Sequence, residues 1–341
     1  MVKSDLHIVA EKLDPKSISA ETERFNNDLI QIMKGGPRWW EVLIVPQVGA
    51  AKYRSMRRNG ETPLPKPVLL DSGKDIKLPS REKGREIPCR VFVPESGKSQ
   101  GIFYHIHGGG WVLQDEKSQD ILLKNLADGA GLTVVSVGYR LAPEHPYPAG
   151  NEDCFDIAEY LVDNAEKEFG GRLLFVGGES AGGHLTVVTT FHLLRARPNF
   201  AFKGILPHYG CFDISGFQPN AHHFDLPLVL DLEIMQHFAA AYVPNSTEAD
   251  RRKPEISPLF ADLTKLKCPP ALFTCGTLDP LLDDSVFMST KWLMSGAEAI
   301  LKLYPGAPHG FTLFPPSVRT ETVKDCLDDT LEFIKDKIGG T

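Results

Sequence analysis

A glycine-serine turn between an apolar run and a helix-like segment constrains the fold of this chain most. Residues 173–185 read LLFVGGESAGGHL, and Gly178 to Gly182 form a Gly-x-Ser-x-Gly pattern around Ser180. On so tight a strand-to-helix turn the serine hydroxyl is exposed at the sheet edge, and side chains at the glycine positions would collide with neighbouring backbone. The following helix adds backbone N–H groups and a positive dipole. The segment therefore predicts a strand, a serine nucleophile and a helix in direct succession.

Strand-like and helix-like segments alternate through most of the chain. Strands are expected at 68–70, 87–93, 102–106, 132–137, 173–176, 203–206, 271–275 and 299–304, and helices at 117–130, 150–168, 183–197, 284–295 and 320–338. The first two strands indicate an antiparallel edge, and the alternation that follows is typical of parallel β-α-β units with helices on both sheet faces. We therefore expect an α/β fold with a mostly parallel eight-stranded sheet flanked by helices.

Two regions depart from this alternation. Residues 17–59 are mainly helical in pattern, and apolar side chains recur at helical spacing at Phe25, Leu29, Ile32 and Met33. Gly35-Gly36-Pro37 then interrupts the helical pattern. A second apolar segment follows, with Trp39-Trp40 and residues 42–45. Residues 209–266 contain a helix-like stretch at 228–242 but no convincing strand. Both regions are expected to lie as helices against the rest of the fold.

Composition and charge exclude several classes of protein. The chain is 42% hydrophobic and 24% charged, which is ordinary for a globular protein, and its net charge of −7 argues against nucleic acid as a partner. Arg57-Arg58 and Arg251-Arg252-Lys253 are interpreted as solvated loop charges. No apolar stretch reaches membrane-spanning length and no signal core opens the chain, so we expect a cytoplasmic protein without a membrane span. The six scattered cysteines predict free, buried thiols.

A second glycine-rich motif follows the strand expected at 102–106. His107-Gly108-Gly109-Gly110-Trp111 leaves backbone N–H groups uncovered at the same sheet edge as the serine turn. The N–H groups of Gly108 and Gly109, with that of Ala181, are candidates for an oxyanion hole. A flexible glycine turn is the structural alternative, and no Gly-x-Gly-x-x-Gly or Gly-x-x-x-x-Gly-Lys pattern supports a phosphate-binding loop.

A serine nucleophile needs a base, and the base needs a carboxylate that orients it. His309 and Asp279 each lie in a loop after one of the last two expected strands, and the order Ser180, Asp279, His309 is the one found in α/β-hydrolases. Asp283 and Asp284 are alternative acids, although their place at a helix start favours N-capping.

The other histidines have structural interpretations. His107 is expected to order its own loop, His184 to be packed and hydrogen-bonded on the helix after Ser180, and His222-His223 to face solvent or substrate. No His, Cys, Asp and Glu pattern has metal-ligand spacing, so neither a metal nor another cofactor is expected.

Taken together, these motifs resemble the hormone-sensitive-lipase-like family of α/β-hydrolase carboxylesterases over residues 65–338. The segments that carry the resemblance are His107 to Trp111, Tyr139 to Ala149, Gly178 to Gly183, Asp279 to Leu281 and His309 to Phe311. The resemblance implies a helical cap built from 1–60 and 209–266 over a catalytic domain of 61–208 and 267–341. Dimers are common in that family, so a homodimer is a further expectation, although no segment of this chain marks its interface.

The chain departs from the family pattern at two positions. Glu179 precedes the nucleophile where many members have Asp or Thr, and its partner cannot be named from the sequence. Leu282 stands where relatives commonly have Arg, which removes a local ion pair but leaves the three catalytic candidates intact.

The function that these residues predict is hydrolysis of short- to medium-chain carboxylic esters through an acyl-enzyme. Lactone, amide or formamide hydrolysis would use the same groups, and a non-catalytic small-ligand receptor of the same fold is a third reading, against which the presence of His309 argues. Trp111, Tyr209, Phe212 and Phe311 are candidate pocket walls because they adjoin the motifs, although each could equally lie in the core.

Overall fold

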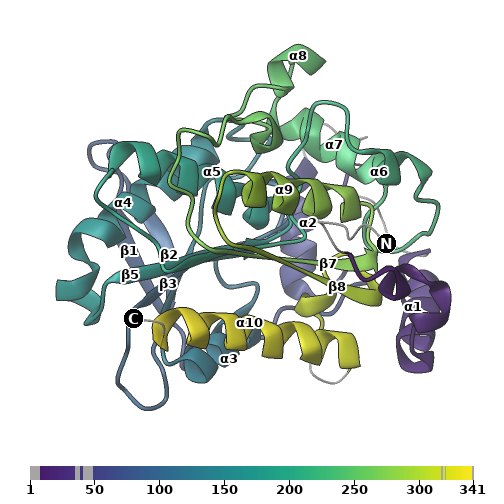
Figure 1. Ribbon diagram of the computed structural model, residues 1–341, viewed down its shortest axis with the longest axis horizontal. Helices are drawn as coiled ribbons and strands as arrows, with labels where there is room; N and C mark the ends of the chain where they lie inside the picture. The colour runs from purple at the N-terminus through teal and green to yellow at the C-terminus, as the bar shows by residue number, and fades with distance from the viewer. Residues whose placement is uncertain (1–7, 35–38, 41–48, 316–317, 319, 340–341) are drawn as a thin grey trace, which may run out of the picture.

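Eight strands form one sheet in the computed structural model, which describes residues 8–34, 39–40, 49–315, 318 and 320–339 (Figure 1). The strands are β1 (Lys74–Pro79), β2 (Glu86–Phe92), β3 (Ile102–Ile106), β4 (Thr133–Val137), β5 (Leu173–Glu179), β6 (Gly204–His208), β7 (Ala271–Leu278) and β8 (Ala299–Pro308). Their order is β1-β2-β4-β3-β5-β6-β7-β8. The two pairings that involve β2 are antiparallel and the others are parallel, which confirms the predicted sheet.

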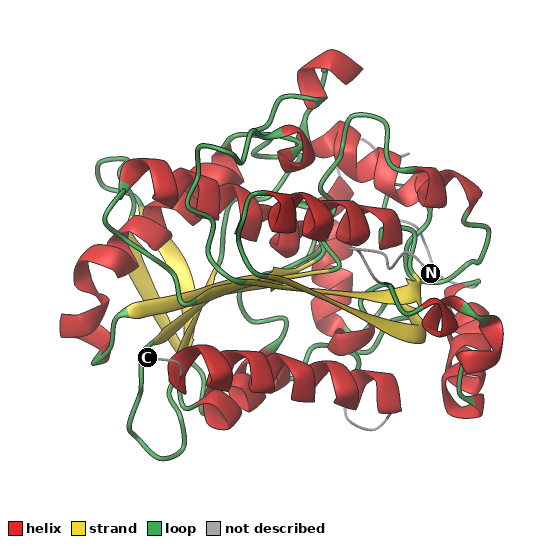
Figure 2. Ribbon diagram, in the orientation of Figure 1, coloured by secondary structure: helices red, strands yellow, loops and turns green. Residues whose placement is uncertain are grey.

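Helices cover both faces of this sheet (Figure 2). The helices are α1 (Ala20–Met33), α2 (Gly49–Asn59), α3 (Asp120–Ala130), α4 (Ala149–Phe169), α5 (Ala181–Ala196), α6 (Pro219–His223), α7 (Leu232–Tyr242), α8 (Glu248–Arg251), α9 (Leu282–Met294) and α10 (Glu321–Gly339), with short 3-10 turns at Ala10–Leu13, Pro15–Ser17, Pro258–Phe260 and Phe311–Leu313. In Figure 1, α3 and α10 lie on one face, and α4, α5 and α9 lie on the other. The central strands β3 to β6 are buried almost throughout because both of their faces are covered.

The prediction of a first strand at 68–70 is wrong. Val68 and Leu69 are 47% and 61% exposed, and the edge strand β1 begins only at Lys74. Only Leu78 of β1 is buried. An edge strand this exposed carries little apolar alternation, so the more apolar but unpaired segment at 68–70 was the stronger sequence signal.

Helix α1 lies beside strand β8. Ser19 caps its start by accepting a hydrogen bond from the Thr22 N–H, and the Asn26 side chain donates to the Gly306 carbonyl at 2.8 Å. Ile32, expected on the apolar face, is largely exposed. The expected break at Gly35-Gly36-Pro37 and the apolar run at 42–45 lie outside the described residues.

The insertion at 209–266, described throughout, contains α6, α7 and α8 and no strand. Its main helix, α7, begins at Leu232 rather than 228, because the Asp231 carboxylate accepts a hydrogen bond from the Ile234 N–H and caps the helix there.

The cysteine prediction is confirmed, since all six are free and all but the half-buried Cys268 are buried. In the described part of the chain, no helix combines the length and apolarity that a membrane crossing requires.

Candidate active site

Ser180 occupies the sharp turn between β5 and α5. Its backbone is strained, with φ 58° and ψ −118°, and its N–H donates to the His208 carbonyl at 2.9 Å. A Cβ at Gly178 or Gly182 would collide with the carbonyl oxygen of Ile106. The two glycines of the motif are therefore required by the close approach of strand β3.

A continuous chain of hydrogen bonds joins Ser180, His309 and Asp279. His309 Nε2 lies 2.8 Å from Ser180 Oγ, and His309 Nδ1 lies 2.8 Å from Asp279 Oδ2. The other oxygen of Asp279 accepts the Leu281 N–H at 2.8 Å, which fixes the carboxylate. Because a carboxylate can only accept, Nδ1 carries the proton and Nε2 is left to accept the serine hydroxyl. The three side chains, expected on separate loops, are thus brought together in a geometry suited to nucleophilic catalysis.

Tyr209 encloses the base. Its ring packs edge-on against His309 with centroids 5.2 Å apart, and its hydroxyl lies 2.5 Å from Thr312 Oγ1. Tyr209 is fully buried, so it holds water away from one side of the imidazole.

The two alternative acids have other partners than those expected. Neither caps its own helix, α9, as the sequence predicted. Asp284 is buried and accepts the N–H groups of Phe212 and Asp213 at 2.6 and 2.9 Å, while Asp283 accepts the N–H of Asn220 at 2.9 Å. Both carboxyl groups therefore hold the insertion, and neither reaches His309.

The glycine loop after β3 presents unpaired backbone donors beside the serine. Among the described residues, no carbonyl or side chain accepts a hydrogen bond from the N–H groups of Gly108, Gly109 or Ala181. All three residues line the cavity at Ser180. Gly109 has φ 102°, a conformation that residues with side chains rarely adopt, and a Cβ there would collide with the Leu113 carbonyl, so glycine is required at this point of the loop.

Trp111 ties the glycine loop to α5 and to the insertion. Its indole Nε1 donates to His184 Nδ1 at 3.2 Å, and its ring stacks on Tyr242 with centroids 4.5 Å apart. His184 Nε2 in turn donates to the Ile256 carbonyl at 2.8 Å. Burial lowers the pKa of His184 to about 4, so the ring stays neutral and keeps this tautomer near neutral pH.

Glu179, whose partner the sequence did not reveal, bonds to His105 and Gln119. Its Oε2 lies 3.0 Å from His105 Nε2 and 3.1 Å from Gln119 Nε2, and all three side chains are buried. Burial alone would raise the pKa of the Glu179 carboxyl, but the charge and hydrogen bond of His105, aided by His208 and Gln119, lower it overall. A buried carboxylate therefore joins strands β3 and β5 to the start of α3, directly next to the serine.

A cavity of about 170 Å³, here called the serine cavity, opens at Ser180. Apolar and aromatic side chains dominate its wall: Met33, Trp39, Trp40, Tyr53, Trp111, Tyr209, Phe217, Ile234, Met235, Phe238 and Leu281. Trp111 and Tyr209 thus lie where they were expected. Phe212 and Phe311 do not, because Phe212 packs edge-on against Phe273 and Phe311 packs with Tyr304 in the core.

Several residues of the wall were not anticipated from sequence. Trp39 stacks on Phe238 and Trp40 on His237, with centroids 5.3 and 4.4 Å apart, so the tryptophan pair packs on α7. The spacing of Ile234, Met235 and Phe238 on one helical face is the signal that could have identified α7 as a wall.

The prediction for Arg57 is wrong. Arg57 is not a solvated loop charge but a half-buried side chain in α2, whereas its neighbour Arg58 is exposed. Arg57 lines the serine cavity.

The remaining histidines lie apart from the reacting groups. His107 Nδ1 donates to the Gly108 carbonyl at 2.8 Å, and the exposed His222 bonds to the Gly216 carbonyl. Within the described ranges, no group of three or more His, Cys, Asp or Glu side chains is arranged to hold a metal ion.

Comparison with known proteins identifies the family of this chain. The family described as alpha/beta hydrolase fold matches residues 103–313, more than half of the chain. This chain belongs to the hormone-sensitive-lipase-like family of α/β-hydrolase carboxylesterases. It is 33% identical over 279 residues to carboxylesterase NlhH of Mycobacterium tuberculosis, covering 78% of this chain and 83% of that protein.

Two further proteins show similar likeness to this chain. Ethyl acetate hydrolase of Pseudomonas putida is 30% identical over 241 residues, which is 70% of this chain and 74% of that protein. The solved structure of a hyperthermophilic esterase from Pyrobaculum calidifontis superposes with a TM-score of 0.78 at 28% identity, covering 94% of this chain and 98% of that one.

Proposed function

We propose that the chain hydrolyses short- to medium-chain carboxylic esters through an acyl-enzyme formed on Ser180. The observation that carries this proposal is the hydrogen-bonded series Asp279–His309–Ser180, with 2.8 Å at each step, beside backbone N–H groups that have no other acceptor.

In the proposed mechanism, Ser180 Oγ attacks the ester carbonyl while His309 Nε2 takes its proton. The N–H groups of Gly108, Gly109 and Ala181 stabilise the oxyanion, and Asp279 stabilises the imidazolium. His309 then gives the proton to the leaving alkoxide oxygen, and the C–O bond breaks. Water activated by the same imidazole hydrolyses the acyl-enzyme and restores the serine.

The preference for short to medium chains is supported by the aromatic wall of the serine cavity. A relative named ethyl acetate hydrolase is consistent with a small substrate.

We also propose that 1–60 and 209–266 serve as the cap of a catalytic domain made of 61–208 and 267–341. Trp39, Trp40 and the α7 side chains that line the cavity support this division.

Replacing the nucleophile tests the proposal directly. Ser180→Ala is expected to lower kcat for p-nitrophenyl butyrate by about a million-fold, because the acyl-enzyme can no longer form. An acyl series from acetate to palmitate should show kcat/KM falling beyond medium length. An unchanged rate in Ser180→Ala would overturn the mechanism, and a rate that rises up to palmitate would overturn the chain-length assignment.

Lactone, amide and formamide substrates would use the same groups, so they are compared in the same assay. A receptor would bind esters without turning them over. The intact bond between His309 and Ser180 favours the enzyme over that reading.

A further inference from the structure

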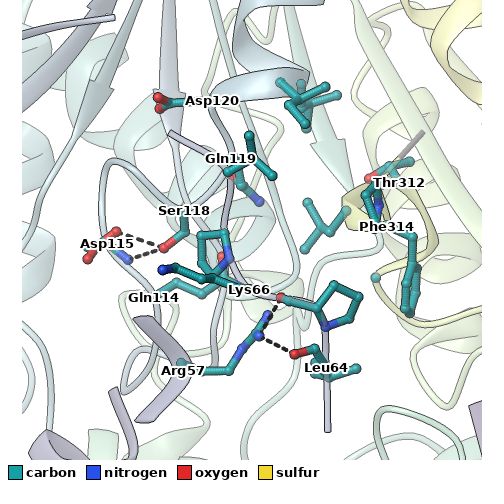
Figure 3. Close-up of a pocket in the computed structure, with 18 of the residues that line it drawn as sticks. Arg57, Leu64, Lys66, Gln114, Asp115, Ser118, Gln119, Asp120, Thr312 and Phe314 are labelled. Carbon is teal, nitrogen blue, oxygen red and sulfur yellow. Dashed lines mark hydrogen bonds between the residues drawn. The ribbon is translucent and has the colours of Figure 1, made fainter. Parts of the chain in front are cut away.

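A second cavity of about 140 Å³ adjoins the serine cavity, and Figure 3 shows it. Arg57 lies on its α2 side, Gln119 and Asp120 at the start of α3, and Thr312 and Phe314 in the segment after β8. We call it the arginine cavity. Arg57, Gln114 and His309 line both cavities, whereas Ser180 lines only the serine cavity. The arginine cavity therefore continues the site on the far side of the base.

Arg57 presents an unneutralised positive charge to this cavity. Its Nη1 donates to the carbonyl oxygens of Leu64 and Pro65 at 2.8 and 2.6 Å, which fixes the guanidinium in place. In the part of the chain that the structure describes, no carboxylate lies within ion-pair distance of Arg57, and neither its Nε nor its Nη2 has a protein acceptor. Burial lowers the pKa of the Arg57 side chain, yet a guanidinium keeps its charge at any pH that the protein tolerates.

The carboxylates in the wall do not offset this charge, because each is already paired. Asp115 bonds to Arg58 at 3.4 Å, and the buried Asp120 bonds to Arg90 at 2.5 Å. Lys66 also lines the cavity and has no carboxylate partner among the described residues. The lining is therefore positive in a chain whose net charge is −7.

Two amide oxygens indicate that the cavity is made for a polar group. Oε1 of Gln114 and Oε1 of Gln119 are buried and have no hydrogen-bond donor among the described residues. Gln119 cannot simply rotate to use its oxygen elsewhere, because its Nε2 is bonded to Glu179. Gln114 is held at φ 67°, an uncommon conformation for a side-chain-bearing residue. Buried acceptors of this kind are normally satisfied, so an N–H or O–H group on a bound molecule would complete them. An ionised carboxylate only accepts, so the recognition of an anion rests on Arg57 and not on these two oxygens.

We propose that Arg57 binds an anionic group, a carboxylate or a phosphate, on the alcohol part of the substrate ester. The direction follows from the role of His309 in the proposed function, on which this inference rests. His309 protonates the leaving oxygen, so the atoms beyond that oxygen lie on the His309 side, where the arginine cavity begins. A guanidinium with free Nε and Nη2 donors matches the two oxygens of such a group.

The test compares matched esters that differ in one charge. On the alcohol side these are 4-butyryloxybenzoate, its neutral methyl ester and 4-butyryloxyphenyl phosphate, and on the acyl side p-nitrophenyl hemisuccinate and p-nitrophenyl butyrate. Arg57→Gln should lower kcat/KM for 4-butyryloxybenzoate or the phosphate by about tenfold to a hundredfold, mainly through KM, because charge-assisted hydrogen bonds are lost. The two neutral esters should change little. Whichever of the carboxylate and phosphate esters responds more identifies the anion.

The matched control is Arg195→Gln, which removes the same charge from an exposed position in the last turn of α5. Arg195 lines neither cavity, so the ratio of charged to neutral ester should stay at the wild-type value. Arg57→Lys keeps the charge and should retain part of the preference, which separates charge recognition from damage to the loop at 64–65.

Equal losses on charged and neutral esters in Arg57→Gln, with no recovery in Arg57→Lys, would overturn the proposal. A loss confined to the hemisuccinate would overturn the assignment to the alcohol side. If the wild type hydrolyses none of the neutral esters, it is the proposed esterase function that fails, and the inference falls with it.

Discussion

At the scale of single residues, hydrogen-bond partners separate three aspartates that lie close together in sequence. Asp279 contacts the base, whereas Asp283 and Asp284 hold backbone N–H groups of the insertion. All three are the same type of residue in one short segment, so only their partners distinguish a catalytic role from a structural one.

The aspartates can be distinguished by conservative amide substitutions. Asp279→Asn should lower kcat by about ten-thousand-fold, because an amide no longer holds the tautomer or stabilises the imidazolium. Asp283→Asn should cost less than about tenfold, since it weakens one backbone cap worth about 1 kcal/mol. Steady-state kinetics on p-nitrophenyl butyrate measures both. Similar rates in the two variants would remove Asp279 from the proposed triad.

The sequence could predict the candidate triad because each member follows a strand that is buried and apolar, and parallel strands end at one edge. Arg57 could not be predicted in the same way. A charged pair on a polar helix has the pattern of a solvated face, and only the fold shows that Arg57 faces inward while Arg58 does not. The prediction that Phe212 and Phe311 line the pocket is wrong because a position next to a motif does not determine which way the ring points.

At the scale of secondary-structure elements, the buried Glu179 connects three of them at the nucleophile. Its bonds to His105 and Gln119 link β5 to β3 and α3. Removing one member of such a buried group leaves the others without partners, which is more costly than removing a surface charge.

Glu179→Gln is therefore expected to lower the free energy of unfolding by about 3 kcal/mol. The control is Glu166→Gln, which changes an exposed residue of α4 and should leave the free energy of unfolding almost unchanged. Denaturant unfolding of Glu179→Gln, His105→Gln and the double variant measures the coupling between the two side chains. Additive effects would show that the pair contributes nothing beyond its separate contacts.

Element positions can be predicted from the sequence wherever the burial pattern is regular along the element. Strands β3 to β6, covered on both faces, appeared as apolar runs, and α10 appeared as a long periodic helix. The edge strand β1 was missed because pairing to β2, rather than burial, holds it in the sheet. The start of α7 was placed four residues early because apolar spacing continued past the Asp231 cap.

At the scale of the whole molecule, three buried histidines make stability depend on pH. Burial lowers the pKa of His107, His184 and His208 from 6.5 to about 4 in each case. Between pH 6.5 and 4 the unfolded chain therefore binds up to three protons more than the native protein does. The free energy of unfolding therefore falls as the pH falls. Asp284 acts in the opposite sense, since burial raises its pKa from 3.8 to about 8 and the native protein keeps its proton in this range.

The histidines outnumber Asp284, so we expect stability to decrease on acidification by about 1.4 kcal/mol per pH unit for each net proton. Urea unfolding at pH 6.5, 5.5 and 4.5 measures this slope. Asp284→Asn removes the opposing group and should make the decline steeper. A decline as shallow as in the wild type would mean that Asp284 is ionised in the native protein.

The stacking of Trp111 on Tyr242 has an optical consequence. Three of the four tryptophans, Trp39, Trp40 and Trp111, line the serine cavity, and Trp292 is buried in the core. The indole of Trp111 contacts both the insertion and a neutral imidazole, so its emission depends on whether those partners stay in place. The protein thus carries its own fluorophores at the entrance to the nucleophile, and ligand entry can be followed by intrinsic fluorescence without any label.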